Sequence, residues 1–103
     1  MNNLAEQIDD YLRYSQIERG LSPNTIAAYQ QDLQEFLAYV KEEQMKDWPL
    51  EAVEIDAFLA KERDLGKANS SISRLVSTLR RFYQWLVRQQ LIEDLHAAVD
   101  GLG

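Results

Sequence analysis

The chain has 103 residues, of which 46% are hydrophobic and 27% charged, as expected for one soluble globular domain large enough to bury a core. It has no cysteine, no apolar run near the ~18 residues of a membrane span and no secretory signal at residues 1–6, so we expect a cytoplasmic protein without disulfides, thiolate metal sites or membrane contact. The net charge of −6, taken alone, argues against a nucleic-acid ligand.

The first two predicted elements are amphipathic helices. The first spans about residues 3–18, and Gly20 is expected to end it because glycine accepts the left-handed backbone conformation. The second begins at Ser22-Pro23, because serine is a preferred N-cap and proline at the first helical position loses no hydrogen bond. Spacings of three and four predict two inner faces: Leu4, Ile8, Tyr11, Leu12 and Ser15 in the first helix, and Ile26, Tyr29, Leu33, Phe36, Leu37 and Val40 in the second.

Two more helices are predicted after a connector at residues 45–52, where Pro49 disfavours helix at Trp48. The third helix covers about residues 55–65, buries Phe58 and Leu59, and ends at Gly66. The fourth runs from about residue 69 to 89, with a core face made of Ile72, Leu75, Val76, Leu79, Phe82, Tyr83 and Leu86. No stretch alternates like a strand, so the sequence predicts an all-α fold: a compact four-helix bundle over residues 1–90, with a possible short extra helix in the tail 91–103.

Positive charge is concentrated in the predicted fourth helix. Residues 67–90 contain five of the eleven basic residues and none of the seventeen acids. At about 100° per residue, with Ile72 at zero, four of these cations fall within about 160–220°, opposite the predicted core. They recur every seven residues and form what we call the basic ridge: Lys67, Arg74, Arg81 and Arg88. A helix face selected only for stability usually mixes charges of both signs, so the lack of acids indicates a surface that faces an anion such as phosphate.

A second acid-free stretch, residues 20–31, carries no charge of either sign. Ser22, Asn24 and Thr25, together with the free N–H groups of the first helical turn, are suited to accept a phosphate. The role of Ser22 as an N-cap is by itself a sufficient alternative explanation for this pattern.

No catalytic or ligand-binding constellation is visible in the sequence. His96 is the only histidine and lies in the tail, and the five tyrosines lie on or beside predicted core stripes, where packing is the default role. There is no glycine-rich phosphate loop. We therefore expect no metal, no cofactor and no catalysis by this chain.

Two blocks resemble a known family. Residues 18–29, ERGLSPNTIAAY, and residues 70–86, SSISRLVSTLRRFYQWL, are similar to the core-binding domain of tyrosine recombinases and phage-type integrases, with the bacterial Xer group as the nearest match. The resemblance implies a SAM-like helical domain that forms one half of a clamp around duplex DNA. It also implies a separate catalytic domain, absent here, that carries the tyrosine nucleophile. Residues 91–103 would then lead into the interdomain linker of a truncated parent protein.

The residue pattern and the resemblance together predict a non-catalytic DNA-binding domain that acts in DNA recombination. The expected partners are double-stranded DNA and, for the full-length protein, other recombinase protomers in a tetrameric synaptic complex; the isolated domain is expected to be monomeric. The alternative is a helical protein-interaction domain whose basic ridge binds an acidic protein, which accounts more easily for the net acidity. The predicted DNA contacts are Ser22, Asn24, Thr25, Tyr29, Lys67, Ser70, Ser71, Arg74, Ser77, Thr78 and Arg81.

Overall fold

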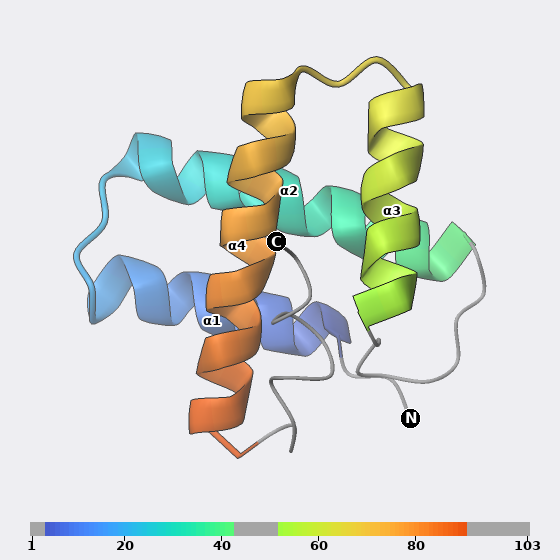
Figure 1. The fold of residues 1–103 in the computed structure, drawn as a ribbon. Helices are drawn as coiled ribbons and strands as arrows, with labels where there is room; N and C mark the ends of the chain where they lie inside the picture. Colours follow the sequence, from blue (N-terminus) through green and yellow to red (C-terminus); the bar gives the residue numbers. More distant parts are fainter. Residues whose placement is uncertain (1–3, 43–51, 91–103) are drawn as a thin grey trace. The chain divides into compact units, whose positions relative to one another are not determined.

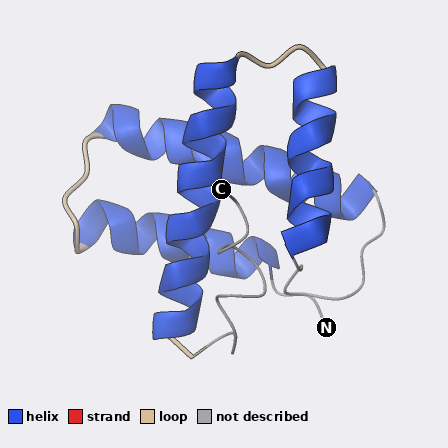
Figure 2. Ribbon diagram, in the orientation of Figure 1, coloured by secondary structure: helices blue, strands red, loops and turns tan. Residues whose placement is uncertain are grey.

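The structure, a computed structural model, describes residues 4–42 and 52–90, and these ranges contain four helices and no strand. The helices are α1 (Leu4–Ile17), α2 (Pro23–Glu42), α3 (Ala52–Asp64) and α4 (Asn69–Arg88). Figure 1 labels them and colours them along the sequence, and Figure 2 colours all of them as helix. The predicted all-α class is confirmed. The chain divides into two units, residues 1–48 and 49–103, with α1 packed on α2 in the first and α3 on α4 in the second.

In the first unit, the turn between α1 and α2 has the predicted signals at both of its ends. Gly20 adopts a positive φ of 61° just after α1. The Thr25 N–H donates to Ser22 Oγ at 3.2 Å, which is the N-cap bond expected when Pro23 occupies the first helical position. The two hydroxyl oxygens, Ser22 Oγ and Thr25 Oγ1, lie 3.0 Å apart.

Most of the predicted inner face of this unit is buried. The buried residues are Leu4, Ile8, Tyr11 and Ser15 in α1, and Tyr29, Asp32, Leu33, Phe36, Tyr39 and Val40 in α2. Leu12, Ile26 and Leu37, which the spacing also predicts to be core residues, are only half-buried. Asp32 and Tyr39 are buried although the sequence pattern does not select them.

In the second unit, α3 ends in a Schellman motif centred on Gly66, whose φ is 91°. The Lys67 N–H donates to the Glu62 carbonyl at 3.2 Å, and the Gly66 N–H donates to the Arg63 carbonyl at 3.0 Å. Such motifs commonly add an apolar contact between the two side chains at the positions that Lys67 and Glu62 occupy here. In its place Lys67 Nζ lies 4.0 Å from Glu62 Oε1. The turn that delivers the chain into α4 is therefore fixed by two backbone bonds and one ion pair.

The start of α3 differs slightly from the prediction, at Ala52 rather than residue 55. Ile55, Phe58, Leu59 and Glu62 are buried in it, which confirms the two predicted apolar positions and adds two others. The predicted connector at Trp48-Pro49 lies outside the described residues, as do His96 and the tail with its possible short helix.

The C-terminal end of α4 carries a conformational strain that suggests a stabilising substitution. Gln90 has a φ of 60° and donates its N–H to the Val87 carbonyl at 2.9 Å, so it occupies the left-handed position after the helix that glycine prefers. We expect Gln90→Gly to raise the free energy of unfolding by about 0.5–1 kcal/mol, because a side chain disfavours this conformation by about 1–2 kcal/mol and glycine's extra freedom when unfolded offsets part of the gain. Urea denaturation measures the change. Gln89, whose φ is −84°, provides the matched control: Gln89→Gly should destabilise the fold, and a gain there would contradict the argument.

Candidate nucleic-acid interface

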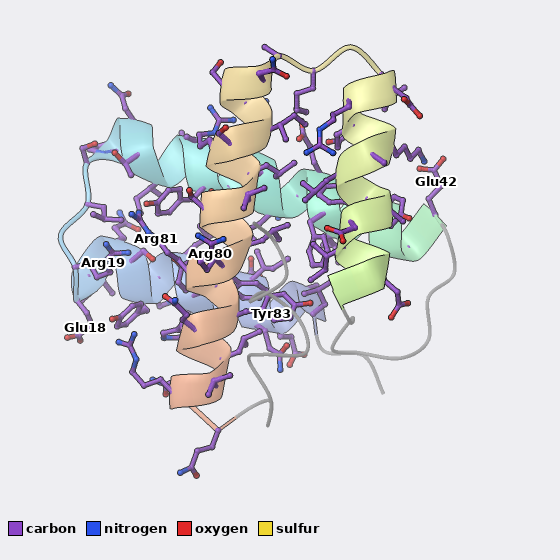
Figure 3. All side chains as sticks on the ribbon, in the orientation of Figure 1. Glu18, Arg19, Glu42, Arg80, Arg81 and Tyr83 are labelled. Carbon is purple, nitrogen blue, oxygen red and sulfur yellow. The ribbon has the colours of Figure 1, made fainter. Side chains whose placement is uncertain are left out.

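The outer surface of α4 is polar and carries no acid. Its exposed side chains are Asn69, Ser70, Ser73, Ser77, Arg81, Gln84 and Arg88. On a helical projection with Ile72 at zero they cover an arc of about 60–180°. We call this set the exposed arc. Two arginines of this surface are half-buried: Arg80 lies at about 80°, within the range of the arc, and Arg74 lies at about 200°, just beyond its edge. Figure 3 shows Arg80 and Arg81 projecting from α4 at successive positions.

The prediction that the basic ridge lies directly opposite the core is wrong on the side of α4 that carries Thr78 and Trp85. Thr78 is a predicted DNA contact and Trp85 falls at about 220°, at the edge of the predicted ridge, but only 1% of Thr78 and 7% of Trp85 are exposed. The buried face of α4 is wider than its aliphatic residues suggested, because the indole ring and the threonine methyl group extend it. The centre of the exposed arc therefore lies about 70° from the centre of the predicted ridge. Thr78 does not belong to the outer surface and leaves the set of candidate contacts.

Lys67 is also less available to bind an anion than its place in an acid-free segment suggested. Its side chain is 18% exposed, and its ammonium group lies 4.0 Å from the carboxylate of Glu62, whose side chain is 10% exposed. The acid belongs to α3, five residues earlier and across the turn. The charge of Lys67 is thus compensated within its own unit.

The candidates on α2 form a small polar cluster at the start of that helix. Ser22 and Asn24 are exposed, and Thr25 is half-buried with its backbone N–H bound to Ser22 Oγ. Tyr29 is 8% exposed and so packs as a core residue, as its spacing already implied. These residues belong to the first unit, whereas Ser70, Ser71, Ser77 and the arginines belong to the second.

The structure adds four side chains that belong neither to the basic ridge nor to the predicted DNA contacts. Asn69, Ser73 and Gln84 lie in the exposed arc, and the half-buried Arg80 lies within the same angular range. Arg80 lies in the same acid-free segment as the basic ridge but outside its seven-residue repeat, so a reading of the whole segment rather than of one repeat would have selected it. Within residues 4–42 and 52–90, no cluster of three or more metal-ligating side chains is found, and no helix there is long and apolar enough to cross a membrane.

Residues 8–90 match the family model described as phage integrase, N-terminal SAM-like domain. The chain belongs to this family. The match covers both units and all of α2, α3 and α4, and it confirms the predicted SAM-like class. No match to a solved structure was found.

Curated relatives of this SAM-like domain are named as tyrosine recombinases. The chain is 38% identical over 93 residues to tyrosine recombinase XerD of Oceanobacillus iheyensis, which covers 88% of this chain and 31% of that protein. It is 40% identical over 87 residues to XerD of Lacticaseibacillus casei, covering 84% and 29% of the two chains. With tyrosine recombinase XerC of Pseudomonas syringae pv. tomato it shares 31% identity over 100 residues, covering 96% and 33%. The chain thus spans about a third of the length of these relatives.

Proposed function

We propose that this domain binds duplex DNA through the exposed arc of α4 and its two half-buried arginines, Arg74 and Arg80, as the non-catalytic DNA-binding part of a tyrosine recombinase. The observation that carries the proposal is the complete absence of acids from residues 67–90 of a chain that has seventeen of them, in the helix that presents Arg81 and Arg88 to solvent. A carboxylate on this surface would repel phosphate, whereas arginine releases counterions when it neutralises one.

The small side chains of the exposed arc are consistent with an approach to a groove. Ser70, Ser73 and Ser77 are exposed on the N-terminal half of α4, and serine hydroxyls can contact either phosphate or base edges. The arginines then lie at the edge and C-terminal end of the same surface, where they would hold phosphates. An arginine bordering the arc, such as Arg74, is the group suited to read a guanine edge with two donors.

The start of α2 is a secondary part of the proposed DNA surface. The polar groups of Ser22, Asn24 and Thr25 and the first-turn amides can accept a phosphate without any cation. Their contribution is expected to be smaller than that of α4, because Ser22 Oγ is already committed to the N-cap bond. In the parent protein we propose that residues 1–90 form this domain, that residues 91–103 lead to a catalytic domain, and that further recombinase protomers assemble with it on DNA.

The proposal is tested by titrating a fluorescently labelled duplex with the 103-residue chain at two salt concentrations. Neutralisation of about four phosphates gives a slope of about −3.6 in a plot of log K against log salt, so raising salt from about 50 to about 200 mM should weaken binding about 100-fold. Affinity that does not change with salt would contradict a phosphate-binding arc.

The competing function is binding of an acidic protein, for which the net charge of −6 is a smaller obstacle than for binding of the more densely charged DNA. Such binding would also weaken with salt, so backbone amide shifts on addition of duplex DNA separate the two functions. DNA binding should shift the amides of α4 around Ser70, Ser77 and Arg81. Unchanged spectra at DNA concentrations well above those of the protein would leave the protein partner as the better explanation.

A further inference from the structure

The outer face of α1 carries a shallow hollow that the DNA-binding proposal does not use. It has a volume of about 310 Å³ and is lined by four residues of α1 and by Glu18 directly after its end, spaced by three and four: Asp10, Arg13, Tyr14, Ile17 and Glu18. With Ile8 at zero these positions fall at about 140–280°, away from the buried face of α1. Ile17 is 68% exposed, a large fraction for a side chain of its size and apolarity. We call these five residues the α1 patch.

Part of the α1 patch is held in place by neighbouring groups. The Tyr14 ring lies 6.3 Å from the ring of Tyr11, tilted by 30°, and Tyr11 is itself buried. Arg13 Nη1 donates to Asp10 Oδ1 at 3.1 Å, but both side chains are more than half exposed, at 66% and 57%. Such an exposed pair exchanges partners at little cost. Arg13 can therefore turn to a carboxylate from outside the chain. Glu18 is exposed at the end of α1 and points outward in Figure 3.

The order of these side chains makes the patch complementary to itself. When two copies of α1 are laid antiparallel, with a two-fold axis between positions 15 and 16, Tyr14 of each copy faces Ile17 of the other. The same register sets Arg13 of each copy opposite Glu18 of the other. One arrangement thus buries both apolar groups and pairs both charges, twice over, as an isologous interface requires. The Asp10 carboxylates of the two copies lie at opposite ends of the interface and do not face each other.

We propose that the α1 patch is the docking surface for a second copy of this chain, in that antiparallel two-fold arrangement. One helix face buries less than the ~1,200 Å² of a stable interface, so the dissociation constant should lie near ~1 mM and the chain should be monomeric at micromolar concentration. The contact becomes populated when another interaction holds two copies close together. Short tethers give effective concentrations in the millimolar range, which is about the size of the expected dissociation constant. The inference does not rest on DNA binding and is tested without DNA.

Sedimentation equilibrium of the chain up to ~1 mM measures the association. The register makes a specific prediction for two charge-reversal variants, Arg13→Glu and Glu18→Arg. Each alone should lose self-association, because like charges then face each other at both ends of the interface. An equimolar mixture of the two should form a heterodimer of about wild-type affinity, because each copy then meets opposite charge at both ends. A partner surface that lies outside the α1 patch gives no such rescue.

The apolar contribution is tested by Ile17→Asp against Gln16→Asp, an identical substitution at the neighbouring exposed position, which points about 100° away. Ile17→Asp should weaken association at least about tenfold and Gln16→Asp should leave it nearly unchanged. Thermal unfolding of every variant confirms that α1 remains folded. A wild-type chain that stays monomeric to ~1 mM, an unrescued mixture, or equal effects at the two positions would each overturn the proposal.

Discussion

Replacing Arg74 and Arg81 with glutamate should weaken binding of the domain to duplex DNA about 100-fold at moderate salt. Arg81 lies in the exposed arc of α4 and Arg74 borders it, so the double variant places two carboxylates where the proposed function requires phosphates. Each substitution removes one cation that releases counterions and adds one repulsive charge. The slope of log K against log salt should therefore become less steep by about two. Fluorescence anisotropy of a labelled duplex at several salt concentrations measures both quantities.

The matched control is Lys41→Glu/Arg63→Glu, which changes the net charge by the same amount on α2 and α3. Both of these cations are exposed, and neither belongs to the proposed DNA surface. If the loss of affinity came only from the greater acidity of the chain, the two double variants would bind equally weakly. A loss confined to Arg74→Glu/Arg81→Glu locates the interaction on α4. Equal losses would contradict the proposed surface even if wild-type binding were salt-dependent.

Local signals in the sequence were sufficient to predict the helices. The pair Ser22-Pro23 specifies a helix start through one side-chain bond and one preset φ angle, and the structure has both the bond and the start. Gly66 specifies a helix end because only the left-handed conformation closes that turn cheaply, and its φ is 91°. Such features depend on a few adjacent residues, so no knowledge of packing is needed to find them.

The limits of the exposed arc depend on packing and were not predictable in the same way. Periodicity located the centre of the buried face of α4, but Trp85 and Thr78 are amphipathic residues that either face accommodates. Which face they occupy is decided by the neighbours that surround them, and here both are buried. The pairing of Lys67 with Glu62 was missed for a related reason: the two residues are joined across a turn, where helical spacing rules no longer say which side chains meet.

The same dependence on packing gives a stability prediction that separates two leucines of α2. Leu33 and Leu37 were both predicted to lie in the core, yet Leu33 is fully buried, at 0% exposure, and Leu37 is only half-buried. Leu33→Ala should lower the free energy of unfolding by about 3 kcal/mol, because it removes transfer energy and leaves a cavity. Leu37→Ala should cost about 1 kcal/mol, since water already reaches the side chain and no closed cavity forms. Urea denaturation of the two variants measures the difference.

These two variants delete the same atoms from the same helix. Intrinsic helix propensity changes equally at the two positions, so it cancels, and the difference reports burial alone. For a domain of this size, a gap of about 2 kcal/mol separates the melting temperatures by about 10 °C, which calorimetry resolves easily. Equal losses would mean that position 37 is as enclosed as position 33, and that the regular spacing of apolar residues describes α2 better than the arrangement found here. A larger loss at Leu33 means instead that the neighbours of α2, rather than its periodicity, decide which leucines stabilise the fold.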